Sequence, residues 1–218
     1  MKQTPIVRRA KRRGRIVFAL DATMSRAPTW RLARQVQSEM FVAAEEMGGL
    51  EVQVVFFRGQ GELRKSAWTK RSGTLADRMS RVQCRSGLTQ IARVLKHTAT
   101  QAEMDNVDAL VYIGDAVEEN PDLLGDLAGK LGLRNVKLFA FQEGQDRQVE
   151  TIMRDLARLT NGAYAHFDTS SPDTLKALLR AVGAYAAGGL SALKSLASKE
   201  PEASALLRQI PSGDSAAS

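Results

Sequence analysis

Short runs of apolar residues alternate along the chain with longer segments in which apolar residues recur every three or four positions. Four nearly continuous runs, rich in Val, Ile and Phe, occupy residues 16–20, 52–57, 109–113 and 136–141, and a weaker one occupies residues 163–167. Because these runs do not alternate with polar residues, they are typical of strands that are covered on both faces of a sheet. The pattern therefore predicts a buried central sheet.

The longer segments have the spacing of amphipathic helices. They cover residues 32–47, 89–104, 123–131 and 149–159, and a last long helix follows the weak strand. Two helix starts are marked, because Asn120 and Ser171 can each act as an N-cap before a proline at the first helical position. Strands that alternate with helices predict an α/β fold: a Rossmann-like three-layer sandwich with a mainly parallel central sheet and helices on both faces.

The 218 residues are enough for one sizeable domain with short appendages. We expect a basic N-terminal arm at residues 1–15, an α/β domain at residues 16–193, and a C-terminal tail at residues 194–218 with a short helix over 203–210. The five apolar residues that follow the basic start are too few for a secretory signal, and no run reaches the roughly 18 residues that span a bilayer. These features predict a cytoplasmic protein without a membrane segment.

The formal charge of +7 is unevenly distributed. Residues 1–15 hold seven of the 31 Lys and Arg and no acid, so the rest of the chain has 24 basic against 24 acidic residues. Within that neutral part, residues 58–85 carry eight basic and two acidic side chains, and residues 103–130 carry eight acidic side chains and one basic. The arm and the 58–85 patch favour acidic partners. The single cysteine excludes a disulfide framework and a multi-cysteine zinc site.

Oxygen-bearing side chains follow the predicted strands at the edge where open α/β sheets bind ligands. Asp21, Thr23 and Ser25 come directly after the first run, at alternate positions that an extended segment would point to one side. Asp115 follows the run at 109–113, and Thr89 opens the helix at 89–104. Two carboxylates and three hydroxyls from three loops are hard ligands that suit Mg²⁺ or Mn²⁺ rather than zinc or copper.

These residues resemble a known motif. The sequence Asp-x-Thr-x-Ser at residues 21–25 is similar to the Asp-x-Ser-x-Ser of the metal-ion-dependent adhesion site (MIDAS) of von Willebrand factor type A (VWA) domains. Thr89, within Gly-x-Thr, matches the separate threonine of that site, and Asp115 matches its last aspartate. The resemblance covers residues 15–193 and departs from the family at Thr23, where serine is usual and where the extra methyl group crowds the metal shell.

The resemblance implies a binding module and not an enzyme. In such VWA domains the serine and threonine oxygens hold Mg²⁺, the aspartates supply charge directly or through water, and a carboxylate from a partner protein completes the coordination. Intracellular bacterial members often work beside AAA-type ATPases, including MoxR-type and metal-chelatase assemblies, so the resemblance implies an AAA-type ATPase as a partner class. The alternative is a domain that keeps the fold with a metal-free site.

The sequence is also compatible with two other functions. The arm and the 58–85 patch are also compatible with a nucleic-acid-associated protein that binds phosphates without stacking on bases, since no aromatic residue interrupts the arm. An aspartate after the first strand also begins Mg²⁺-dependent phosphatases of the haloacid dehalogenase type, but Thr23 stands where they need a second aspartate. Residues 59–66 nearly match a phosphate-binding loop, yet Arg64 replaces an essential glycine, and we expect a charged surface turn.

Overall fold

The computed structural model of the chain describes residues 12–211, apart from the side chains of Ser25 and Glu46. Its centre is a six-stranded sheet with the order β3-β2-β1-β4-β5-β6, in which β3 is antiparallel to β2 and all other neighbours are parallel. The strands are β1 (Gly14–Asp21), β2 (Leu50–Arg58), β3 (Glu62–Lys65), β4 (Ala109–Gly114), β5 (Lys137–Glu143) and β6 (Ala163–Phe167). The five apolar runs therefore each mark a strand, and β3 is additional.

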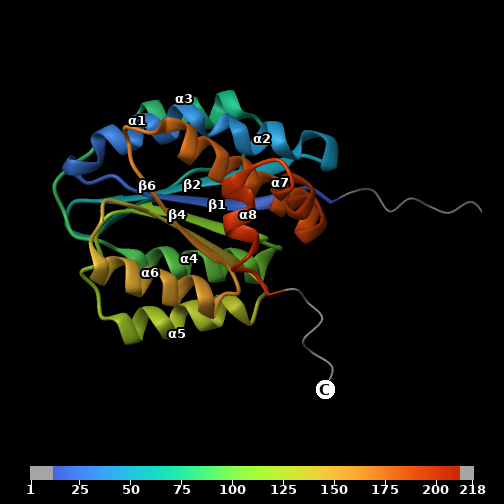
Figure 1. Cartoon of the computed structure of the whole chain (residues 1–218). Coiled ribbons are helices and arrows are strands. Elements are labelled where there is room, and N and C mark those ends of the chain that lie inside the picture. The colour runs from blue at the N-terminus through green and yellow to red at the C-terminus, as the bar shows by residue number, and fades with distance from the viewer. Residues whose placement is uncertain (1–11, 212–218) are drawn as a thin grey trace, which may run out of the picture.

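Helices cover both faces of this sheet (Figure 1). One layer consists of α1 (Ala27–Val36), α2 (Ser38–Ala44), α3 (Ser72–Ser80) and α7 (Pro172–Ala197), and the other of α4 (Ile91–Met104), α5 (Pro121–Gly132) and α6 (Arg147–Leu159). Two 3₁₀ turns, η1 (Met24–Arg26) and η2 (Glu45–Met47), and the short α8 (Pro201–Leu207) are the remaining helical elements of the described part. Alternate residues of β1 enter two separate cores, with Phe18 in the α1–α7 core and Val17 in the α4–α6 core. The predicted three-layer α/β fold is confirmed.

The sequence pattern did not predict β3, the edge strand next to β2, or the helix α3 that follows it in the chain. Residues 59–66, expected to be a charged surface turn, form a turn at 59–61, and residues 62–65 continue as β3, which pairs with the end of β2 in a hairpin. Leu63 is the single apolar residue of β3. Because the other side chains of this edge strand are charged, the strand leaves little hydrophobic signal in the sequence. The helix expected over residues 32–47 begins earlier, at Ala27, and is divided at Gln37 into α1 and α2.

The two predicted helix caps differ in outcome. The Asn120 side chain accepts hydrogen bonds from the N–H groups of Asp122 and Leu123, at 2.8 and 3.3 Å, as an N-cap should. The Ser171 side chain makes no capping hydrogen bond, although Pro172 does begin α7. The prediction of a side-chain cap at Ser171 is therefore wrong, and the proline alone marks that helix start.

The C-terminal segment packs on the domain. α7 continues past residue 193, the expected boundary, and has a kink at Gly189, whose φ is 66°. The helix expected over residues 203–210 is present as α8, and its Ala203 and Leu206 are fully buried in the α1–α7 core. Next to α8, the side-chain amide of Gln209 accepts from the N–H of Tyr164 and donates to its carbonyl, both at 2.9 Å. Gln209 therefore pairs with the outer edge of β6 as a neighbouring strand would. No helix among residues 12–211 is both long enough and apolar enough to cross a lipid bilayer.

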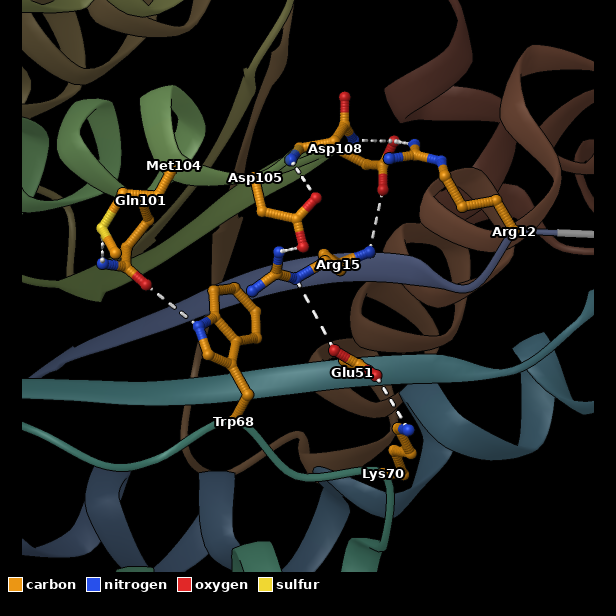
Figure 2. A network of polar contacts seen from close by, with 10 residues as sticks. Arg12, Arg15, Glu51, Trp68, Lys70, Gln101, Met104, Asp105 and Asp108 are labelled. Carbon is orange, nitrogen blue, oxygen red and sulfur yellow. Dashed lines mark hydrogen bonds and ion pairs between the residues drawn. The ribbon is translucent and has the colours of Figure 1, made fainter.

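Residues 12–15 of the predicted basic arm are part of the domain, while residues 1–11 lie outside the described residues. The Arg12 guanidinium bonds Asp108 at 2.6 Å, and the N–H of Arg15 donates to the same carboxylate at 2.8 Å. The Arg15 guanidinium pairs with Asp105 and lies over the Trp68 ring, 4.0 Å from its centroid. Figure 2 shows this network, which connects the start of β1 with the loop before β4. It lies at the amino-terminal ends of these strands, opposite to their carboxyl ends.

The close crossing of α2 and α7 can be tested with one added methyl group. A β-carbon at Gly183 in α7 would come within 2.3 Å of the Met40 carbonyl oxygen in α2. Gly183→Ala should therefore lower the free energy of unfolding by about 1–3 kcal/mol, the usual cost of overpacking. Gly129→Ala in α5 is the matched control, because nothing lies within 4 Å of its new β-carbon, and it should raise stability by up to about 1 kcal/mol. Urea unfolding measures both, and equal effects would contradict the close crossing.

Candidate metal centre

Two predicted ligands lie at the carboxyl ends of neighbouring strands in the middle of the sheet. Asp21 is the last residue of β1, and Asp115 directly follows β4, which pairs with β1. After β1 the chain enters α1 on one face of the sheet, and after β4 it enters α5 on the other face (Figure 1). The two strands therefore flank the point where the winding of the fold reverses, which is where open α/β sheets bind ligands.

The carboxylate of Asp21 is held in a poorly solvated position. The residue is 4% exposed, and its side chain accepts a 2.7 Å hydrogen bond from the N–H of Thr23. The pKa of Asp21 rises to about 6, mainly because burial disfavours the charged form. The negative charge of Asp115 acts in the same direction, whereas hydrogen bonds from Thr23 and the charge of Arg26 lower the pKa. Asp21 and Asp115 are thus close enough for the charge of one carboxylate to affect the other.

The loop after β1 is less extended than expected. Thr23 is buried and has an extended backbone (φ −71°, ψ 163°), but the chain then turns into η1, where the N–H of Arg26 bonds the Thr23 carbonyl at 3.0 Å. This turn ends the extended segment, so the prediction that residues 21, 23 and 25 follow one extended strand is wrong for Ser25. The backbone of Ser25 lies in η1, and its side chain is outside the described part of the structure.

Thr89 is positioned by the loop between β4 and α5. Its N–H donates to the Glu118 carboxylate at 2.7 Å, and its hydroxyl oxygen accepts from the N–H of Glu118 at 3.1 Å. The adjacent Glu119 carboxylate accepts from two N–H groups at the start of α4, at 2.7 and 2.8 Å. These bonds satisfy N–H groups that a helix start leaves without partners, and they connect Thr89 to the loop that carries Asp115.

A guanidinium lies beside Asp115. Arg26 in η1 pairs with Asp115 at 3.1 Å and with Glu143, the last residue of β5, at 2.5 Å. Thr29 of α1 also donates its hydroxyl hydrogen to Glu143. Sequence reasoning missed Arg26 and Glu143 because 117 positions separate them. The available signal is that Arg26 directly follows Ser25, a predicted ligand.

A buried phenol oxygen lies next to the predicted ligands. Tyr112 of β4 is 3% exposed, and its hydroxyl has no hydrogen-bond partner among the described residues. That oxygen lies against Gly114, where a β-carbon would come within 2.7 Å of it. Burial raises the pKa of Tyr112 well above its usual value, and the negative charges of Asp21 and Glu119 add to this effect. The phenol therefore stays protonated and is a hydrogen-bond donor close to the carboxylates.

The side chains gathered at these strand ends fit a hard divalent cation. Asp21, Thr23, Thr89 and Asp115 offer oxygen atoms, and burial raises the pKa of both carboxyls, so a nearby cation would relieve an electrostatic cost. The Tyr112 hydroxyl, which has no hydrogen-bond partner among the described residues, would be able to donate to a water molecule bound to such a cation. Among residues 12–211, no three His, Cys, Asp or Glu side chains meet as a metal site. A cation at these strand ends would therefore need the threonine hydroxyls as well as the two carboxylates.

Some cations of the basic patch at residues 58–85 pair with carboxylates within the domain. Arg58 and Arg64 both pair with Glu62, at 3.0 and 2.9 Å. Lys70 pairs with Glu51 at 3.3 Å. Cations that already have a carboxylate partner gain less from a phosphate, so Arg58, Arg64 and Lys70 contribute less to nucleic-acid binding than the charge of the patch suggests.

Known structures share the fold of this chain. No protein family and no curated protein matches the sequence. The structure resembles the VWA domain of SpRpn10, with a TM-score of 0.58 and 10% identity over 74% of this chain and 94% of that chain. It also resembles the vWF domain of the type V pili tip protein Mfa5 from Porphyromonas gingivalis, with a TM-score of 0.56 and 9% identity over 78% of this chain and 93% of that chain.

A third similar structure is proximal thread matrix protein 1 (PTMP1) from the mussel byssus, in a form with a zinc-occupied MIDAS motif. The TM-score is 0.59 and the identity 18% over 78% of this chain and 48% of PTMP1, so the chain spans about half of that protein. At such identities the likeness establishes the fold, and the fold of this chain is the VWA fold. The VWA fold that the sequence resemblance implied is therefore confirmed.

The raised pKa of Asp21 predicts a pH-dependent stability. The folded protein binds the Asp21 proton more tightly than the unfolded chain, so without metal the free energy of unfolding should fall as the pH rises from about 4 to about 6. Asp21→Asn removes this cost and should be more stable than the wild type at pH 8 in EDTA, by up to about 3 kcal/mol. At pH 4 the two proteins should be nearly equal. Urea unfolding at both pH values measures this, with Asp77→Asn at an exposed position as control; parallel profiles for wild type and Asp21→Asn would contradict the raised pKa.

Removing the Tyr112 hydroxyl should stabilise the metal-free protein. A buried donor without a partner costs about 1–3 kcal/mol, so Tyr112→Phe should raise the free energy of unfolding in EDTA by about 1 kcal/mol. Tyr164→Phe is the control, because that hydroxyl donates to Gln142 at 2.7 Å and its loss should be destabilising. Chemical denaturation distinguishes the two, and a comparable loss of stability in both variants would mean that the Tyr112 hydroxyl has a partner.

Proposed function

We propose that this chain is a metal-dependent protein-interaction module with a MIDAS-like centre. Asp21, Thr23, Ser25, Thr89 and Asp115 would hold Mg²⁺ or Mn²⁺, and a carboxylate of a partner protein would complete the coordination. The observation that carries the proposal is the pair of partly desolvated carboxylates at the reversal point of a VWA fold, together with a buried threonine from each of two adjoining loops.

The chemistry of the site supports binding rather than turnover. A divalent cation held by two carboxylates and neutral hydroxyls would supply attraction for a further anion. The residues of the chain do the rest: Asp21 and Asp115 provide charge in a setting where burial makes that charge costly, and Thr89 is fixed by its two hydrogen bonds with Glu118. A rigid set of ligands loses little entropy when a partner binds.

Exposed apolar side chains stand next to the predicted ligands. Met24, between Thr23 and Ser25, is 59% exposed, and Leu88, directly before Thr89, is 61% exposed. Large apolar side chains around a polar centre are typical of surfaces that bind other proteins. They support a protein partner over a small anion, because a small anion would leave both side chains in water.

The finer assignments follow the sequence resemblance and are part of the proposal. We place the protein among intracellular bacterial VWA domains, in the cytoplasm, with an AAA-type ATPase as the partner class. The zinc-occupied MIDAS motif of PTMP1 supports the use of a divalent cation at this position of the fold. The partner should present an aspartate or glutamate.

Thermal unfolding with and without metal tests the centre. Several millimolar Mg²⁺ or Mn²⁺ should raise the Tm of the wild type relative to EDTA, since a ligand at 100 times its Kd stabilises by about 2.7 kcal/mol. Thr89→Val removes a ligand oxygen at nearly constant volume and should lower the metal affinity at least tenfold, whereas Thr89→Ser should retain it. A wild type that does not respond to metal, or a Thr89→Val variant that responds equally, would contradict the proposed centre.

The partner chemistry needs a separate measurement. Peptide libraries with a fixed central Glu or a fixed central Gln can be compared for binding in Mg²⁺ and in EDTA. Binding should require both the Glu and the metal. Equal binding of the Gln library in Mg²⁺ would contradict recognition through a carboxylate.

A further inference from the structure

Arg26 pairs with Asp115, the carboxylate that a bound metal would also use. Its Nη2 pairs with Oδ2 of Asp115 at 3.1 Å, and its Nη1 pairs with Oε2 of Glu143 at 2.5 Å. The planar guanidinium therefore bridges the ends of β4 and β5, a geometry that favours two carboxylates at once. The Arg26 side chain is 14% exposed, so this bridge is shielded from water and from salt.

From this geometry we infer that Arg26 is an internal cation that competes with the metal for Asp115 and so sets the metal affinity of the site. The inference rests on the proposed metal centre. Without metal, Arg26 supplies the positive charge that Asp115 requires. With metal, the divalent ion supplies that charge, the pair between Arg26 and Asp115 weakens, and Glu143 keeps the guanidinium.

The charges at the strand ends explain why the two cations compete. When ionised, Asp21, Asp115 and Glu143 carry three negative charges, and Arg26 neutralises one of them. A divalent ion at Asp21 and Asp115 would lie close to the guanidinium of Arg26. The repulsion between these like charges would weaken metal binding about tenfold. The backbone of Arg26 is held by the hydrogen bond from its N–H to the carbonyl of Thr23 at 3.0 Å, so the side chain alone adjusts when metal binds.

Glu143 makes the exchange feasible without exposing Arg26 to solvent. Its carboxylate also accepts a hydrogen bond from Thr29, so it is held in place independently of Arg26. A pocket of about 440 Å³ opens beside the bridge and is lined by Arg26, Asp115, Glu143, Asp146 and Asp168, among others. The guanidinium therefore has both room and a second carboxylate when the metal takes Asp115.

Isothermal titration of purified full-length protein with Mg²⁺ alone and Mn²⁺ alone, at pH 8, tests the inference. Arg26→Gln should bind each metal about tenfold more tightly than the wild type, and its Tm in EDTA should be lower, because Asp115 and Glu143 lose their cation. Arg26→Lys keeps the charge and should stay close to the wild-type affinity. Circular dichroism confirms that each variant folds.

A double-mutant cycle separates the role of Glu143 from general electrostatics. Glu143→Gln should weaken metal binding several-fold in the wild type, because Arg26 then has Asp115 as its remaining partner in the bridge. In the Arg26→Gln background the same change should have a much smaller effect. Asp168→Asn, at a carboxylate of the same pocket, is the control and should weaken binding equally in both backgrounds.

The outcomes distinguish this inference from the proposed function. If the wild type and Arg26→Gln bind metal with equal affinity, or Arg26→Gln binds more weakly, the competition is wrong while the metal centre stands. If Glu143→Gln has the same effect in both backgrounds, Glu143 does not act through Arg26. If no variant binds metal, Arg26→Gln included, the proposed metal centre fails and the competition fails with it.

Discussion

The candidate site depends on the burial of β1. Strands β2 and β4 pair with its two edges, helices cover its two faces, and the side chains of residues 16–20 are at most 1% exposed. A carboxylate at the end of such a strand is removed from water by its surroundings, which is why the pKa of Asp21 reaches about 6. Asp21 therefore requires compensating groups, and the rest of the site can be understood as the set of groups that supply them.

The neighbouring acids are compensated in different ways. Glu118 and Glu119 accept backbone N–H groups at and before the start of α4, so their charges also stabilise that helix. Asp115 and Glu143 share the guanidinium of Arg26. Each carboxylate thus fixes a loop in place: the first two hold the Thr89 loop against the β4–α5 loop, and the last two hold η1 against the ends of β4 and β5. The arrangement gives the strand ends a defined geometry before any ligand binds.

The fold and the positions of Asp21 and Asp115 at the strand ends could be predicted because both follow from local pattern. Apolar runs mark strands that are buried on both faces, and a residue such as Asp115 at the end of a run has to lie at the edge of the sheet. The bridge from Arg26 to Glu143 could not be predicted, because a pairing across 117 positions depends on how the strands are ordered. The edge strand β3 was missed because its local pattern is weak: Leu63 is its single apolar residue.

The two margins of the sheet are closed by different means. At one margin, the charged strand β3 is a poor template for further pairing. At the other, Gln209 occupies the backbone groups of Tyr164 with its side-chain amide, and α8 is anchored there by the buried Leu206. An incoming strand would first have to remove a packed helix. Lateral growth of the sheet by pairing with the strand of another chain is thereby disfavoured at both margins.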